Sequence, residues 1–322
     1  MQIGNIQLKN NLIFAPMAGI SDLPTRKLMR KFGAGLAVSE MVSSNSLLYG
    51  SKKTARRADL SQEDAPTSVQ IMGTVPQMMA DAVMYNIDKG ADIIDINMGC
   101  PAKKVCNVMA GAALMRDEKL VEQILNAVIK KSSVPITLKI RLGWDDDHIN
   151  AQQITMIAEN CGVSAITIHG RTRAQGYSGE ANYDEVAKIK QKIKIPIIAN
   201  GDINSAQKAQ YVLEKTKVDA LMIGRAAMGN PWIFKNITHF LQHNEILPKP
   251  TIAEIREILL EHLQQLYQFY GEYMGVMMAR KHISWYSKSQ KNSATFRQKV
   301  NKIKNANEQQ QAVDEFFNNF LL

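Results

Sequence analysis

Short apolar segments rich in β-branched residues recur along the first two-thirds of the chain. Apolar runs of this kind are typical of parallel strands that are covered on both faces. Eight such segments are predicted as strands: Leu12–Ala15, Ala37–Met41, Ser68–Ile71, Ile93–Asn97, Ile136–Ile140, Ala165–His169, Pro196–Asn200 and Ala220–Ile223.

Stretches with a helical pattern lie between these strands. They are Pro76–Lys89, Glu118–Lys131, Ala151–Asn160, Tyr183–Gln191 and Ser205–Glu214. Eight strand and helix units of roughly 30 residues favour a closed (β/α)₈ TIM barrel over an open doubly wound sheet. An open dinucleotide-binding sheet would carry G-x-G-x-x-G after its first strand, whereas this chain has Pro16-Met17-Ala18-Gly19 there.

The pattern changes after Arg225. Leu247-Pro248-Lys249-Pro250 reads as a linker, and the chain beyond it has no strand alternation. Helical composition covers Ile252–Tyr270, Val276–Ser287 and Ala294–Phe320. We therefore predict an α/β fold, with a TIM-barrel catalytic domain over residues 1–244 and a smaller all-α helical domain over residues 245–322.

Composition excludes several classes of protein. The chain has 322 residues, of which 45% are hydrophobic and only three are cysteine. With no C-x-x-C pair, neither a disulfide framework nor a structural zinc site is expected, and we predict no metal. Residues 1–16 lack a signal-peptide pattern, and no apolar run approaches the roughly 18 residues of a membrane span. We expect a cytoplasmic protein that acts away from membranes, with no evident obligate protein partner.

The formal charge is +9, and one long stretch in the helical part of the chain has basic residues but no acidic ones. No Asp or Glu occurs from Tyr273 to Asn307, and Trp285, Tyr286 and Phe296 lie among the basic residues of this stretch. A basic surface attracts nucleic acid and other polyanions; the alternative is a solvated helix face whose aromatic side chains pack inward. The basic residues are Arg280, Lys281, Lys288, Lys291, Arg297, Lys299, Lys302 and Lys304.

Polar residues or glycines follow every predicted strand after the first. TIM-barrel enzymes place their catalytic residues at these carboxyl ends, which meet at one mouth of the barrel. We therefore predict an active site there. The residues at the eight ends are Pro16-Met17-Ala18, Glu40, Gln70, Asn97 with Gly99-Cys100-Pro101, Lys139 with Arg141, His169, Asn200-Gly201-Asp202, and Gly224-Arg225.

The last two strand ends indicate a phosphorylated ligand. In this fold the loops after strands seven and eight commonly bind phosphate. Gly201 and Gly224 let backbone N–H groups approach an anion, and Arg225 adds a charge-assisted donor. Sugar phosphates, nucleotides and flavin mononucleotide (FMN) all fit this pattern.

Lys139 lies inside an apolar strand that also carries Arg141, so its amine is expected to point into the mouth or out to water. Beside a flavin it would stabilise negative charge on the reduced ring; the alternative is a Schiff-base lysine. Gln70 would bond the ring edge. His169 would contact the cofactor phosphate or ring, or serve as a structural histidine.

Cys100 follows the fourth strand in the segment Asn97-Met98-Gly99-Cys100-Pro101. A cysteine on such a turn can present its sulfur to a ligand. As a proton donor it must remain a thiol, so its pKa should not be strongly depressed; a thiolate nucleophile is the competing role. Cys106 and Cys161 lack this context and are expected to be structural.

These motifs together resemble the tRNA-dihydrouridine synthases, most closely the bacterial B subfamily. The likeness spans nearly the whole chain, thins after about residue 287, and is most specific in Asn97–Pro101. The segments that carry it are Ala15-Pro16-Met17-Ala18-Gly19, Ser21-Asp22, Ser39-Glu40-Met41, Asp95–Pro101, Leu138–Gly143, His169-Gly170-Arg171-Thr172-Arg173, Asn200-Gly201-Asp202, Gly224-Arg225 and Ala279–Tyr286.

The resemblance implies an FMN-dependent enzyme that NADPH reduces. Hydride from flavin N5 would reach C6 of a tRNA D-loop uridine flipped into the mouth, while Cys100 protonates C5. The subfamily points to uridine 17. Asn97 and Arg141 would hold the uracil edge, and Arg280, Lys281 and Lys288 would hold tRNA phosphates. FMN would be bound by Pro16, Met17, Ala18, Gln70, Lys139, His169, Asn200, Gly201, Asp202, Gly224 and Arg225.

Two rival functions fit parts of the pattern. A flavin barrel that reduces a free small molecule, such as an orotate-type dehydrogenase, shares the phosphate site but does not explain the basic extension. A non-catalytic RNA-binding barrel explains the charge but would purify colourless, without flavin.

Overall fold

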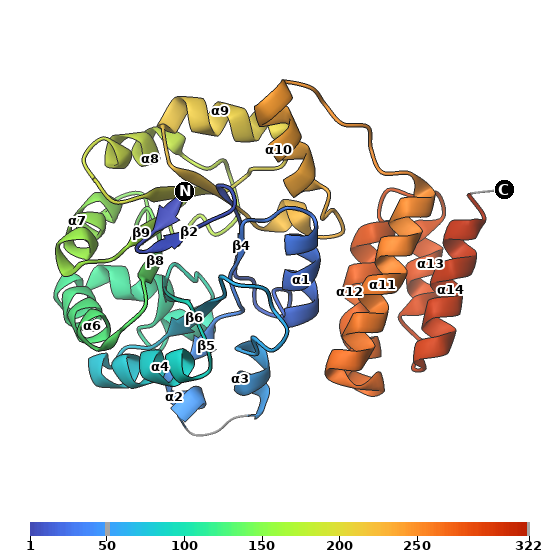
Figure 1. The fold of residues 1–322 in the computed structure, drawn as a ribbon, viewed down its shortest axis with the longest axis horizontal. Helices are drawn as coiled ribbons and strands as arrows, with labels where there is room; N and C mark the ends of the chain where they lie inside the picture. The colour runs from blue at the N-terminus through green and yellow to red at the C-terminus, as the bar shows by residue number, and fades with distance from the viewer. Residues whose placement is uncertain (49–51, 321–322) are drawn as a thin grey trace. The chain divides into compact units, whose positions relative to one another are not determined.

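The computed structural model describes residues 1–48 and 52–320. It divides into two compact units, Met1–Gly224 and Arg225–Leu322 (Figure 1). The helical domain was predicted to begin at residue 245, whereas the structural division falls after Gly224. The difference is a helix, α10 (Ile233–His243), that belongs to the second unit.

The first unit is a parallel barrel, which confirms the predicted fold class. Its sheet has the order β4-β3-β11-β10-β9-β8-β7-β6-β5, and every neighbouring pair is parallel. A parallel bridge from Val38, directly after β4, to Ser68 on β6 closes the sheet into a barrel. The strands are β3 (Leu12–Phe14), β4 (Leu36–Ala37), β5 (Val42–Ser43), β6 (Ser68–Met72), β7 (Ile93–Met98), β8 (Ile136–Arg141), β9 (Ala165–His169), β10 (Ile197–Asn200) and β11 (Ala220–Ile223).

The second predicted strand, Ala37–Met41, differs from the structure. The strand β4 ends at Ala37, and the next short strand, β5, begins only at Val42, after the predicted range. The interruption lies at Ser39, whose hydroxyl donates to the Glu40 carbonyl and accepts from the Gln70 backbone N–H. A side chain thus replaces part of the regular ladder at this point.

Amphipathic helices cover the outside of the barrel (Figure 1). In α6, burial of Val121, Ile124, Leu125 and Val128 gives one apolar stripe, and Asp117 caps the helix by accepting from the Leu120 N–H at 3.0 Å. The helices of this unit are α1 (Leu23–Lys31), α2 (Ser44–Leu48), α3 (Lys52–Arg57), α4 (Pro76–Asp88), α5 (Lys103–Cys106), η1 (Gly111–Arg116), α6 (Glu118–Lys131), α7 (Ala151–Cys161), α8 (Tyr183–Lys190) and α9 (Ala206–Thr216).

The two ends of the barrel differ in polarity. A short antiparallel hairpin, β1 (Gln2–Ile3) with β2 (Ile6–Gln7), packs Ile3 and Leu8 into an apolar cluster with the early residues of several strands. The carboxyl ends of several strands carry buried polar residues, among them Asn97, Arg141, His169 and Asn200. The fold therefore seals one end with apolar packing and leaves the other for chemistry.

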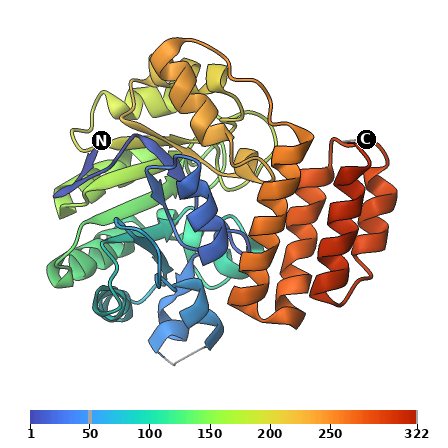
Figure 2. The ribbon, with the colours of Figure 1, turned by 45° about the vertical axis from the view of Figure 1, so that its right-hand side comes forward.

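The second unit is all helical, as predicted (Figure 2). Thr251 and Glu254 form a capping box that starts α11. The predicted helical stretch Ala294–Phe320 is two helices, because Asn305 accepts from the Glu308 N–H at 3.0 Å and starts a new one. The helices are η2 (Arg225–Ala227), α10 (Ile233–His243), α11 (Ile252–Tyr270), α12 (Glu272–Ser287), α13 (Ser293–Val300) and α14 (Ala306–Asn318).

Across residues 1–48 and 52–320, no helix has the length and apolar character that crossing a bilayer requires. The same residues contain no group of three or more His, Cys, Asp or Glu side chains placed to hold a metal ion.

Candidate active site at the barrel mouth

A chain of buried hydrogen bonds crosses three adjacent strands beneath the mouth. Asp95 on β7 accepts from Gln70 Nε2 on β6 and from Thr137 Oγ1 on β8, each at 2.6 Å. Gln70 Oε1 in turn accepts from Asn97 Nδ2 at 2.8 Å. Because Asp95 takes the amide N–H of Gln70, it fixes which end of that amide faces Asn97. Burial raises the pKa of Asp95, while the Thr137 and Gln70 bonds oppose the rise.

Asn97, which this chain of bonds holds in place, in turn fixes the backbone at Cys100. Its Oδ1 accepts from the backbone N–H groups of Gly99 at 3.2 Å and Cys100 at 3.0 Å. Gly111 packs on the other side of the loop with φ +61°, and an added Cβ would lie 2.8 Å from the Cys100 carbonyl oxygen. The turn that carries Cys100 is therefore fixed by a side chain on one side and a required glycine on the other.

The Cys100 sulfur is partly buried, and burial raises the pKa of its thiol. The Ala102 N–H and the cations Arg141 and Lys139 oppose the rise without reversing it. A thiol with a raised pKa stays protonated near pH 7, which suits a proton donor and disfavours a resting thiolate nucleophile. Cys106 is buried and donates weakly to the Cys100 carbonyl at 3.5 Å.

Lys139 lies on β8 with its side chain largely enclosed, and its Nζ donates to Asn200 Oδ1 on β10 at 3.0 Å. Burial lowers the pKa of Lys139 to about 8, with Arg141 adding to the fall and Asp95 opposing it. Asn200 is oriented for this bond because its Nδ2 donates to the Met222 carbonyl. The two predicted cofactor residues are therefore in contact across the mouth.

The loop after β10 has a left-handed backbone at Gly201. Gly201 has φ +122°, and a Cβ there would lie 2.9 Å from Ala181 Cβ. Asp202 follows at φ +48° and pairs with Arg171 Nη2 at 2.6 Å. His169 is buried beside this turn, its ring within ordinary contact distance of the position a Gly201 side chain would take.

The loop after β3 is held by its own side chains. Ser21 donates to the Ala15 carbonyl and accepts from the Met17 N–H, both at 2.8 Å. Glu40 accepts from the Gly19 N–H and pairs with Arg57 Nε at 3.4 Å. These contacts define the position of Pro16, Met17 and Ala18, the first of the predicted cofactor segments.

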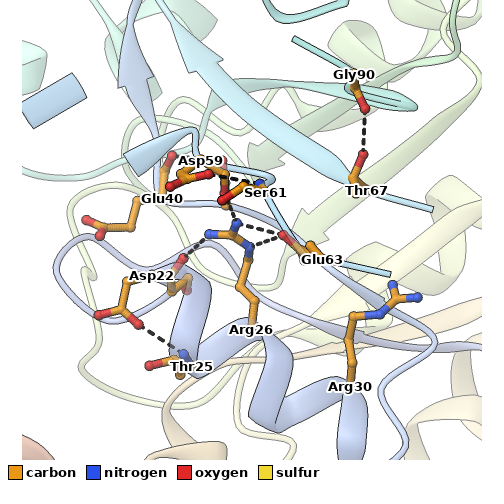
Figure 3. Close-up of polar contacts among 12 residues, drawn as sticks. Asp22, Thr25, Arg26, Arg30, Glu40, Asp59, Ser61, Glu63, Thr67 and Gly90 are labelled. Carbon is orange, nitrogen blue, oxygen red and sulfur yellow. Dashed lines mark hydrogen bonds and ion pairs between the residues drawn. The ribbon is translucent and has the colours of Figure 1, made fainter. Parts of the chain in front are cut away.

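A buried ion pair supports this loop from below (Figure 3). Arg26 on α1 bonds Glu63 through Nε at 2.9 Å and Nη2 at 2.7 Å, with both side chains fully buried. Its remaining donors reach the carbonyls of Ser21 and Asp59. Removing either partner would leave a charge buried without compensation.

Gly224 follows β11 and lies next to Met17. A Cβ on Gly224 would meet Met17 Sδ at 3.4 Å and Ala15 Cβ at 3.5 Å. Packing within the barrel therefore does not demand glycine at this position, which fits a position kept open for a ligand. Arg225 begins the second unit, and its predicted phosphate contact remains a prediction.

Arg141 is buried and bound to main-chain carbonyls. Its Nε donates to Gly99 at 2.9 Å, and its Nη1 donates to Thr172 and Gly176. It thereby ties the Cys100 turn to the loop after β9. The guanidinium also lies 5.6 Å from the ring centroid of Tyr177, an exposed aromatic side chain that the sequence analysis did not select.

In the second unit the predicted tRNA-contacting residues differ in exposure. Lys288 is exposed, whereas Arg280 donates to the Ile303 carbonyl at 3.0 Å and is half-buried. Lys281 is half-buried beside Met278. Two aromatic residues of the stretch pack inward: Tyr286 is buried, and Phe296 stacks on Phe316 with centroids 3.9 Å apart, whereas Trp285 is half-buried.

Comparison with known sequences shows the family to which this chain belongs. The family description "Dihydrouridine synthase (Dus)" matches residues 13–321. The chain is 52% identical to tRNA-dihydrouridine synthase B of Xanthomonas axonopodis pv. citri, over 98% of this chain and 96% of that relative. It is 51% identical to tRNA-dihydrouridine synthase B of Vibrio cholerae, over 99% of each chain.

The chain belongs to the dihydrouridine synthase family. This membership confirms the predicted family and, with it, the predicted class of enzyme, an oxidoreductase. The roles of individual site residues stay predictions.

Solved structures support the fold. Histamine dehydrogenase from Rhizobium sp. 4-9 matches with a TM-score of 0.60 at 12% identity, over 82% of this chain and 50% of that one. A 2-naphthoyl-CoA reductase matches with a TM-score of 0.58 at 13% identity, over 74% of this chain and 51% of that one. The chain spans about half the length of these proteins, and at such identities the likeness shows the barrel fold alone.

Proposed function

We propose that this protein is a cytoplasmic tRNA-dihydrouridine synthase that uses FMN and NADPH. Its substrate is a D-loop uridine, at position 17, whose C5–C6 double bond is reduced. One observation carries the proposal: a thiol with a raised pKa is fixed at the same mouth as a lysine and a left-handed glycine turn.

The residues at the mouth fit FMN. Gly201 and Gly224 lack the Cβ atoms that would crowd a phosphate, and His169 lies beside Gly201. Lys139 supplies a positive charge near the strand ends, and Gln70 supplies an amide. Pro16, Met17, Ala18, Asn200, Asp202 and Arg225 complete the proposed set. Bound FMN would supply the hydride for uracil C6, and NADPH would return the flavin to its reduced form.

The chain's own residues then have separate tasks. The Cys100 thiol donates its proton to uracil C5, which its raised pKa permits near pH 7. Asn97 holds the Cys100 turn through its Oδ1 and bonds Gln70 through one N–H of its amide. Its contact with the uracil edge therefore uses the second N–H of the same amide. Arg141 positions the same turn through Gly99. Tyr177 offers an exposed ring on which a flipped base can stack.

The second unit supplies electrostatic affinity for tRNA. Lys288 and the other exposed lysines of the acid-free stretch contact backbone phosphates, with Lys281 at the edge of this surface. The Arg280 guanidinium is committed partly to the Ile303 carbonyl. Its contribution to tRNA binding therefore includes holding the helices that present the lysines.

The test is to incubate the purified protein with NADPH and unmodified tRNA and to map dihydrouridine by position. Product at uridine 17, formed by a yellow flavoprotein, is the expected result. Turnover of free uracil or dihydroorotate without modified tRNA would favour the small-molecule flavin barrel, and a colourless protein that binds tRNA would favour the non-catalytic one.

A further inference from the structure

Three side chains from successive loops at the barrel mouth form a compact group. Arg116 follows β7, Trp144 follows β8 and Arg173 follows β9. The guanidinium carbons of Arg116 and Arg173 lie 4.8 Å and 4.5 Å from the centroid of the Trp144 ring. We call these three residues the Trp144 cluster.

The cluster is built on a fixed frame. The Arg173 N–H donates to the Gly143 carbonyl at 2.9 Å, and the Ala174 N–H donates to the Trp144 carbonyl at 2.8 Å. Trp144 also packs against the small apolar cluster that contains Cys106. Two loops are therefore joined by main-chain bonds, and the ring rests on the segment that follows the Cys100 turn.

The positive charges of the cluster have no carboxylate partner. Across residues 1–48 and 52–320, no Asp or Glu lies within ion-pair distance of Arg116 or Arg173. The neighbouring carboxylates bind other groups: Asp117 caps α6, and Asp145 pairs with His148. The two guanidinium charges repel each other, and a bound anion close to both would offset this repulsion.

Arg173 adds a second, independent sign of a ligand. Its Nε is buried and has no hydrogen-bond partner among the described residues. A buried charged donor without an acceptor is costly. Phosphate oxygens satisfy such a donor, and the planar guanidinium matches phosphate in a bidentate arrangement. The two guanidinium groups lie over the Trp144 ring, so a base has little free ring surface to stack on. The cluster therefore suits a ligand that accepts hydrogen bonds, such as a phosphate.

We infer that the Trp144 cluster binds a backbone phosphate of tRNA beside the uridine that enters the mouth. The inference rests on the proposed function and adds to it a substrate contact on the catalytic barrel itself. The cluster rests on the segment that carries Cys106, and Cys106 bonds the Cys100 carbonyl. A phosphate held there would set the register of the strand relative to the Cys100 thiol.

The experiment measures tRNA binding in three variants: Arg116→Gln, Arg173→Gln and the double substitution. An unmodified tRNA transcript is titrated at several salt concentrations without NADPH. Loss of the one proposed phosphate contact in the double variant should flatten the slope of log K against log salt by about 0.9, and this variant should bind on the order of tenfold more weakly; each single variant should show part of both effects. Lys130→Gln is the matched control, because Lys130 is exposed in the last turn of α6, which leads to the opposite end of the barrel.

Two further arms separate the alternatives. The double Arg→Lys variant keeps the charges and should keep the salt slope, which a purely packing role for the arginines would not predict. The KM for NADPH, measured with oxygen as electron acceptor, should not change. If the single variants bind tRNA like the native protein, or if the KM for NADPH rises while tRNA affinity holds, the inference is wrong.

This outcome is distinct from failure of the proposed function. Dihydrouridine formation by the native protein tests that function, whereas the binding measurements compare variants without any turnover. If the double Gln variant does not fold, the two single variants decide the question.

Discussion

The Gln70 amide donates to the Asp95 carboxylate at 2.6 Å inside the barrel, and this one contact orders the site above it. It turns the Gln70 carbonyl toward Asn97, which in turn holds the Cys100 turn. Asp95 is not itself a predicted cofactor or catalytic residue, and it bonds Gln70 rather than the thiol. It is a positioning residue that acts through two amides.

Asp95→Asn should weaken both stability and turnover. The new amide cannot accept from Gln70 and Thr137 together, so one buried donor is left unsatisfied at a cost of about 1–3 kcal/mol. Denaturant unfolding measures the first effect and kcat for tRNA reduction the second. Asp219→Asn is the control: Asp219 accepts from Lys190 and the Ile197 N–H at the start of β10, so it should cost stability without lowering kcat.

The Cys100 thiol should react slowly with iodoacetamide near neutral pH. Burial raises its pKa, so the thiolate that reacts is scarce at pH 7 and increases as pH rises. The rate of alkylation, followed by mass spectrometry from pH 7 to 10, should climb across the whole range. A rate already at its plateau at pH 7 would show a resting thiolate and contradict the proton-donor role.

Reactions that need a charged Lys139 should fall as pH rises. Its pKa is about 8, so the side chain is an ammonium below that pH and loses its charge above it; a bound anion would move the fall to higher pH. Single-turnover reduction of tRNA between pH 6 and 10 measures this. Lys139→Arg should remove the part of the fall centred near pH 8 and leave only the loss at higher pH where the Cys100 thiol gives up its proton, and Lys139→Met should be slow throughout. An identical pH profile in native protein and Lys139→Arg would exclude this residue as its origin.

Removing charge from Lys288 should weaken tRNA binding without affecting the fold. Lys288 is exposed, so Lys288→Gln should flatten the salt dependence by up to about one unit while thermal stability holds. Arg280→Gln is the informative contrast. It loses the bond to the Ile303 carbonyl and should lower the melting temperature as well. Unchanged salt dependence in Lys288→Gln would remove this residue from the tRNA surface.

Local pattern predicted most of the fold. The apolar strand runs and the amphipathic helices of the barrel correspond closely to the structure, as between the predicted Glu118–Lys131 and α6. Two errors have local causes that composition does not show. Ser39 interrupts a strand through its hydroxyl, and Asn305 starts a helix within a stretch of otherwise helical composition.

Part of the candidate site could also be predicted, but from the fold and not from local pattern. Strand-end position located Cys100, Lys139 and Asn200, because the fold itself brings those ends together. Asp95 and Thr137 are 42 positions apart, and their bond depends on the register between two strands. The Trp144 cluster likewise joins three loops, so no single stretch of sequence contains its signal.

The most direct test of the account compares two cysteine variants in reduction of tRNA. Cys161 is also a free cysteine, on the outer helix α7, so Cys161→Ala is a matched control for Cys100→Ala. We predict that Cys100→Ala binds flavin and oxidises NADPH like the native protein but forms little dihydrouridine, while Cys161→Ala forms the full amount. Dihydrouridine formed by Cys100→Ala at the native rate would contradict the central claim.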